Sequence, residues 1–173
     1  DLSVLVRIDD ERGAAGLVFN ADGGNRHYGF YPSSGNLRLT RFSGASADSW
    51  LVLYDEPSDA YRPGEWNQLV VRFHADRFEC FVNGVKIVES ADKELAPGKV
   101  GFASFRGTKA EFRRFAVGPN LLPEAATAEA IAAFKRAEAL MQPGRPASRD
   151  VVMELLKHES HVSEFMENEA KSL

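Results

Sequence analysis

Short apolar or alternating runs, separated by turn residues, make up the chain from residue 1 to about residue 118. Alternation with a period of two is typical of strands, and no helical period interrupts it. The pattern predicts ten strands, at residues 2–8, 15–21, 27–31, 36–42, 50–54, 66–74, 77–83, 85–89, 98–105 and 110–117. Many short strands at this spacing indicate an all-β, antiparallel two-sheet sandwich.

Gly-rich and Asn-rich dipeptides between these runs support hairpins. Asn83-Gly84 and the stretch 22–25 (Asp-Gly-Gly-Asn) supply residues that adopt positive φ at low cost. Taking alternate positions of the later strands as inward-facing, we expect a core that includes Leu69, Val71, Phe73, Val100, Phe102 and Phe112.

The pattern changes after residue 118, so we divide the chain into a sandwich at 1–118 and a helical tail at 119–173. Helical spacing predicts two helices, about 123–141 and 149–169, with apolar stripes that include Phe134, Met141, Leu155 and Val162. Isolated helices of this length are marginal in water, so their apolar stripes need another apolar surface to pack against. The tail therefore either packs on the sandwich or begins a further helical domain.

The composition, with 44% hydrophobic and 27% charged residues over 173 residues, is that of a globular protein. A net charge of −4 offers no basic face for nucleic acid, and no apolar run is long enough to span a membrane. The chain starts at Asp1 inside a predicted strand. We therefore expect a fragment of a longer chain, with other domains of that chain as partners.

Four stretches carry a resemblance to a known superfamily. They are 66–71 (WNQLVV), 81–84 (FVNG), 97–102 (PGKVGF) and 112–117 (FRRFAV), in this order. The order resembles the second half of concanavalin A-like, laminin-G-like lectin and glucanase domains, including bacterial three-keto-disaccharide hydrolase-type domains. The resemblance implies a two-sheet jelly roll. The chain departs from it by lacking the opening strand, so part of one sheet is expected to be missing or unpaired.

Catalytic motifs are not evident. Retaining glycosidases need two carboxylates flanking one bond, whereas Glu79 and Glu111 each stand alone in their strands. His158 and His161 are three residues apart, not the four that a helical zinc motif requires, so a solvated helix face is expected there. Cys80 alternates with apolar neighbours and is interpreted as a buried thiol. We lean towards a protein that is not an enzyme.

No cofactor is expected, with one alternative. Asp22 and Asn25 could bind calcium at a sandwich rim, as laminin-G-like domains often do. A plain hairpin turn accounts for the same two residues, and we favour it.

One predicted surface is aromatic and basic. If Leu51 and Leu53 face the core, the strand period places Trp50 and Tyr54 on the outer face. Residues expected beside them are Arg38, His27 and Tyr31. Aromatic rings with nearby arginine and histidine suit a sugar, whose apolar face stacks while its hydroxyls form hydrogen bonds. The alternative is that the tail helices cover this face.

Three functions follow from these features. The first is a non-catalytic carbohydrate-binding or adhesion-like module of a larger exported bacterial protein, located in the periplasm or at the cell surface. The second is a glycoside hydrolase of the three-keto-disaccharide type. The third is a structural spacer or interaction domain.

Overall fold

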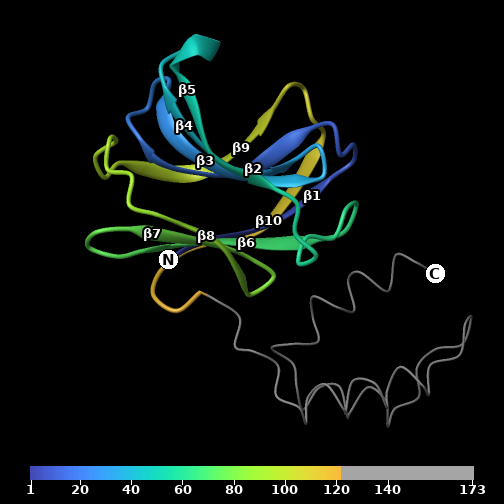
Figure 1. Ribbon diagram of the computed structural model, residues 1–173. Helices are drawn as coiled ribbons and strands as arrows, with labels where there is room; N and C mark the ends of the chain where they lie inside the picture. Colours follow the sequence, from blue (N-terminus) through green and yellow to red (C-terminus); the bar gives the residue numbers. More distant parts are fainter. Residues whose placement is uncertain (122–173) are drawn as a thin grey trace, which may run out of the picture. The chain divides into compact units, whose positions relative to one another are not determined.

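The computed structural model describes residues 1–121, which form two antiparallel sheets of five strands packed face to face. Figure 1 shows the two layers. The strands are β1 (Leu2–Ile8), β2 (Ala14–Ala21), β3 (Arg26–Ser33), β4 (Asn36–Ser43), β5 (Trp50–Glu56), β6 (Asn67–Phe73), β7 (Phe78–Val82), β8 (Val85–Ser90), β9 (Lys99–Phe105) and β10 (Ala110–Val117). Each of the ten predicted segments overlaps one of them, so the predicted jelly-roll sandwich is confirmed.

Sheet A has the strand order β10-β1-β6-β7-β8, and sheet B has the order β5-β4-β3-β2-β9. A single 3₁₀ turn, η1 (Ala47–Ser49), precedes β5. The β7–β8 hairpin turns at Asn83 and Gly84, whose φ values of 49° and 82° are the positive angles that a two-residue hairpin needs. Consecutive strands therefore pair locally over most of both sheets.

The core lies between the sheets, where the inner faces of the central strands are fully buried. It includes Leu17, Phe19, Tyr28, Phe30, Leu69 and Val71. Burial at this level is the main source of stability, at roughly 1.5–3 kcal/mol per large apolar side chain. Leu69 and Val71 are thus confirmed as core residues.

The other four expected core residues lie further out. Phe112 is partly buried against the core. Phe73, Val100 and Phe102 are exposed, and the prediction was wrong for them. The two β9 residues lie on the last strand of sheet B, so their side chains have described strand neighbours on one side only. Phe73 is the last residue of β6 and lies at the end of its sheet.

A partly buried polar network holds the β8–β9 connection against the core. Asp92 accepts hydrogen bonds from the Tyr28 hydroxyl and from Arg41. Burial, together with the bond to Asp92, raises the pKa of Tyr28 to about 12. The network joins β3 and β4 to a segment that has no strand of its own.

The two tail helices and the pair His158 and His161 lie outside the described residues. Within residues 1–121, no helix has the length and hydropathy needed to cross a bilayer.

Candidate functional site

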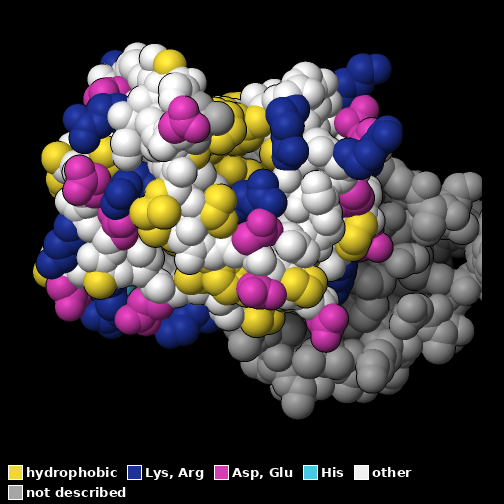
Figure 2. Space-filling view, turned by 45° about the horizontal axis from the view of Figure 1, so that its top comes forward, with side chains coloured by type: hydrophobic (Ala, Val, Ile, Leu, Met, Phe, Trp, Pro, Cys, Tyr) yellow, Lys and Arg dark blue, Asp and Glu magenta, His cyan; other side chains and the backbone are white. Residues whose placement is uncertain are grey.

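The outer face of sheet B is hollowed. In Figure 1, η1 and β5 rise above one side of the sheet, and the β9–β10 connection rises above the other. Figure 2 looks down onto this end and shows hydrophobic side chains at the bottom of the hollow between the two raised regions. We refer to it as the sheet B hollow.

A continuous aromatic row contributes to the sheet B hollow. Phe42 of β4 stacks on His27 of β3, with ring centroids 4.5 Å apart. The Phe105 ring, from the end of β9, lies 5.8 Å from Phe42, and the Trp50 ring meets Phe42 edge-on at 5.0 Å. Four rings from four strands thus form one surface, to which Tyr31 adds a fifth at 5.0 Å from Phe105.

Gly29 allows two of these rings to lie across β3. A Cβ at this position would stand 2.8 Å from Tyr31 Cε1 and 3.2 Å from Phe42 Cε2. Real Cβ atoms essentially never come as close as 2.8 Å to another atom, so a larger residue would force the Tyr31 ring to shift and would crowd Phe42. The absence of a side chain at Gly29 therefore sets the shape of the surface.

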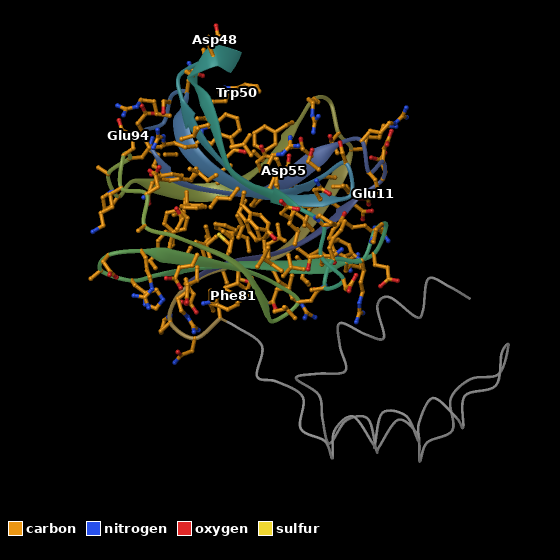
Figure 3. The ribbon with its side chains drawn as sticks, viewed as in Figure 1. Glu11, Asp48, Trp50, Asp55, Phe81 and Glu94 are labelled. Carbon is orange, nitrogen blue, oxygen red and sulfur yellow. The ribbon has the colours of Figure 1, made fainter. Side chains whose placement is uncertain are left out.

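Polar groups accompany the aromatic row. Arg38 donates to Asp55 at 2.6 Å, and Asn36 donates to the same carboxylate at 3.0 Å. Figure 3 shows Asp55 and Trp50 at opposite ends of β5. Arg106 donates to Ser33 and to the Gly13 carbonyl oxygen. Arginine and carboxylate groups at the edge of an aromatic surface can bind hydroxyl groups directionally.

Burial and pairing set the charge of these groups. Burial lowers the pKa of His27, so the ring is neutral at pH 7. Burial opposes ionisation of Asp55, but the hydrogen bonds from Arg38 and Asn36 outweigh it and lower its pKa. Burial raises the pKa of Tyr31, whose hydroxyl lies 3.0 Å from Thr40 Oγ1. The site thus combines a neutral imidazole with an ionised carboxylate.

Two buried nitrogen atoms in this region have no hydrogen-bond partner among the described residues. They are His27 Nε2 and Arg38 Nε. Buried polar atoms are nearly always paired, so each such atom requires an explanation. Both belong to side chains of the sheet B hollow, and neither nitrogen is accessible to solvent in this structure.

Four of the five expected site residues gather here: Trp50, Arg38, His27 and Tyr31. Tyr54 does not, because its side chain packs against the core between the sheets. The β4–β5 register shifts between Leu39 and Thr40, so one extra residue interrupts the alternation of β5. The expectation that Trp50 and Tyr54 share a face was therefore wrong.

Sequence reasoning missed Phe42, Phe105, Arg106 and Asp55. The alternation of β4 could have identified Phe42, which is two residues from Thr40 on the face already assigned to Arg38. The contribution of Phe105 depends on β9 pairing with β2, a long-range contact that the local pattern does not contain.

Other candidate groups have structural partners. Asp22 accepts hydrogen bonds from the backbone of Gly24 and Arg26, as in a hairpin turn. Glu79 contacts His74 and Lys86, and Cys80 is buried. Among residues 1–121, no group of three or more His, Cys, Asp or Glu side chains could hold a metal ion.

Comparison with solved structures shows a similar fold in a carbohydrate-binding module. The carbohydrate-binding module CBM66 from Bacillus subtilis is 17% identical, with a TM-score of 0.57 over 66% of this chain and 71% of that one. Chicken galectin 2 is 16% identical, with a TM-score of 0.46 over 65% of this chain and 86% of that one. No curated protein matches the chain. The family model described as "3-keto-alpha-glucoside-1,2-lyase-like domain" matches residues 2–118.

Proposed function

The chain belongs to the family of 3-keto-alpha-glucoside-1,2-lyase-like domains, within the concanavalin A-like superfamily that its sequence resembles. From this premise we propose that the sheet B hollow binds a saccharide and that the chain acts as a non-catalytic binding module. The observation that carries the proposal is the aromatic row on the outer face of sheet B, with the half-exposed ring of Trp50 at one end and the Arg38–Asp55 pair towards the other.

The chemistry of the hollow suits a sugar ring. The half-exposed Trp50 offers a flat apolar surface for the C–H face of a pyranose or furanose. Arg38 and the ionised Asp55 offer a donor and an acceptor for neighbouring hydroxyls. The ring of His27 is neutral, so sugar binding does not have to remove water from a charged imidazole.

The experiment is a glycan array of neutral oligosaccharides, followed by titration calorimetry of the bound glycans. Arg38→Gln removes a charged hydrogen bond, which is expected to weaken binding roughly 10- to 100-fold. Arg77→Gln is the matched control, because Arg77 pairs with Asp76 and Glu89 on sheet A. Binding of no glycan, or equal losses in both variants, would contradict the proposal and favour a structural spacer.

A second candidate function is the lyase reaction that the family description names. In a 1,2-elimination, a base removes the C2 proton, acidified by the keto group at C3. The electron pair forms a C1–C2 double bond, and the group at C1 leaves with its bonding electrons and takes up a proton. The neutral imidazole of His27, with Nε2 unpaired, could accept the C2 proton.

The elimination also needs an acid for the leaving oxygen. Asp55 cannot serve, because its lowered pKa keeps it ionised at neutral pH. We therefore favour the binding module. Incubation with a 3-keto-α-glucoside distinguishes the two functions, since a lyase would generate the absorbance of a conjugated enone and His27→Gln would abolish it.

We also propose that the protein lies outside the cytoplasm. The reason is that the polysaccharides bound by separate binding modules are found there. Cell fractionation followed by immunoblotting of the full-length protein tests this location. Recovery in the cytoplasmic fraction alone would contradict it.

A further inference from the structure

Arg106 brings a positive charge to the sheet B hollow that the described residues do not neutralise. Its Nη2 atom donates to the Ser33 hydroxyl and, at 3.3 Å, to the Gly13 carbonyl oxygen, so the groups that it contacts among residues 1–121 are neutral. By contrast, Arg38 donates to the Asp55 carboxylate at 2.6 Å. The charge of Arg38 is therefore compensated within the hollow, whereas that of Arg106 is not.

The contact with Ser33 places Arg106 on the face that carries the aromatic row. Ser33 follows Tyr31 by two residues on β3, so the two side chains share the outer face of sheet B. The Tyr31 ring lies 5.0 Å from the ring of Phe105, the residue before Arg106. Burial raises the pKa of Tyr31, and the positive charges of Arg38 and Arg106 oppose this rise. Both guanidinium groups therefore lie near the Tyr31 hydroxyl.

A tight turn between β9 and β10 fixes the position of Arg106. The backbone N–H of Thr108 donates to the Phe105 carbonyl oxygen at 3.1 Å, and the Thr108 hydroxyl donates to the same oxygen at 2.6 Å. Thr108 Oγ1 in turn accepts a hydrogen bond from the backbone N–H of Ala14 at 2.8 Å, which ties the turn to β2. A group that is already held in place loses less conformational freedom when a ligand binds.

Arg106 retains hydrogen-bond donors for a ligand. A guanidinium has five N–H groups, of which Nη2 carries two. The N–H groups on Nε and Nη1 have no acceptor in the part of the chain that the structure describes, and the side chain is exposed. Negatively charged oxygens are the strongest acceptors for such donors. The hollow can therefore bind a carboxylate at Arg106.

The acidic side chains at the hollow favour one orientation of such a ligand. Asp55 is already engaged by Arg38 and Asn36. Asp48 is exposed on η1, near Trp50, which forms one end of the aromatic row (Figure 3). A carboxylate near Trp50 would thus be repelled, whereas one at the β9–β10 end would be attracted.

The charges on the other side of Arg106 do not cancel its own. Arg106 also lines a cavity of about 410 Å³, together with Asp9, Asp10, Arg12 and Lys109. Asp10 pairs with Arg12 at 2.7 Å, so this pair contributes no net charge. The carboxylate of Asp9 then stands against two cations, Lys109 and Arg106. The surroundings of Arg106 are therefore net positive.

We propose that the saccharide bound by the sheet B hollow carries a carboxylate, as a uronic acid does, and that Arg106 binds this carboxylate. The inference rests on the proposed saccharide site and adds the class of sugar. The sugar ring lies on the aromatic row, and its carboxylate points to the β9–β10 end, where Arg106 donates to it. Since Arg38 is paired with Asp55, Arg106 is the group that distinguishes acidic from neutral sugars.

The test compares pairs of saccharides that differ only in this carboxylate. Oligomers of glucose, galactose and mannose are arrayed beside the corresponding oligomers of glucuronic, galacturonic and mannuronic acid. Pairs that bind are titrated by calorimetry with the full chain at about 0.15 M salt. The acidic member is expected to bind roughly tenfold more tightly, as a hydrogen bond between charged groups provides. The neutral member should still bind, because both members contact the aromatic row.

Three variants locate the contact. Arg106→Gln is expected to reduce the affinity for the acidic saccharide to that for its neutral counterpart, without changing the latter. Arg106→Lys keeps the charge and should keep part of the preference, which a purely structural role of Arg106 in the turn would not predict. Lys109→Gln is the matched control, because it removes a positive charge three residues further along the chain, and it should leave the preference unchanged. Thermal unfolding checks that each variant is folded.

The contrary results have distinct meanings. If no saccharide of either kind binds, the proposed function fails and this inference fails with it. If neutral saccharides bind and their acidic counterparts bind no more tightly, the saccharide site stands and the inference is wrong. A preference that persists in Arg106→Gln, or that Lys109→Gln removes equally, would show that Arg106 does not bind the carboxylate.

Discussion

Replacement of Trp50 by alanine should cost little stability while removing the largest apolar surface of the sheet B hollow. The side chain is 51% exposed, and its buried half contacts Phe42. A tryptophan presents up to about 250 Å². Half of that area, at about 25 cal/mol per Å², gives a limit of about 3 kcal/mol. Because denatured chains already bury part of this area, we expect a loss of about 1–2 kcal/mol.

The matched comparison is Phe42→Ala. Phe42 is only 5% exposed and lies within the same aromatic row. Its removal leaves a cavity and should cost about 3–5 kcal/mol. Urea unfolding followed by circular dichroism measures both losses, with the m-value as a check that the denatured state is unchanged. A loss for Trp50→Ala as large as that for Phe42→Ala would refute the reasoning, since Trp50 would then be buried in solution.

Three further predictions concern groups outside the aromatic row. Because the folded pKa of Tyr28, about 12, lies above the unfolded value of about 10, its contribution to stability is complete below pH 10 and is lost as pH rises through 12. In the Tyr28→Phe variant, the free energy of unfolding should fall less between pH 10 and pH 12 than in the original chain. Urea unfolding measured as a function of pH tests this. Burial raises the pKa of the Cys80 thiol well above its usual range, so a thiol reagent should modify it only after unfolding. Gly29→Ala should lower stability by about 1–3 kcal/mol through overpacking, and calorimetric unfolding checks it.

The strands could be predicted from the sequence because their signals are local. Alternation and turn residues such as Asn83-Gly84 act over a few positions, and the structure has all ten strands at the predicted segments. The burial of Cys80 and Leu69 followed from the same alternation, because both lie on central strands of sheet A.

The errors came from information that no local pattern contains. Val100 and Phe102 have an inward alternation, but their exposure depends on β9 being the last strand of its sheet. Tyr54 was assigned to the wrong face because a single extra residue in β5 interrupts the period of two. Phe105 joined the site only through the long-range pairing of β9 with β2.

The central claim is that the sheet B hollow is the saccharide site, and NMR chemical-shift mapping tests it most directly. A glycan selected on the array is titrated into isotopically labelled full chain. We predict that the largest shifts occur at Trp50, Phe42, His27 and Arg38, and that residues 99–102 of β9 stay unperturbed. Shifts concentrated at residues 99–102, or no saturable shift in the sheet B hollow, would contradict the account.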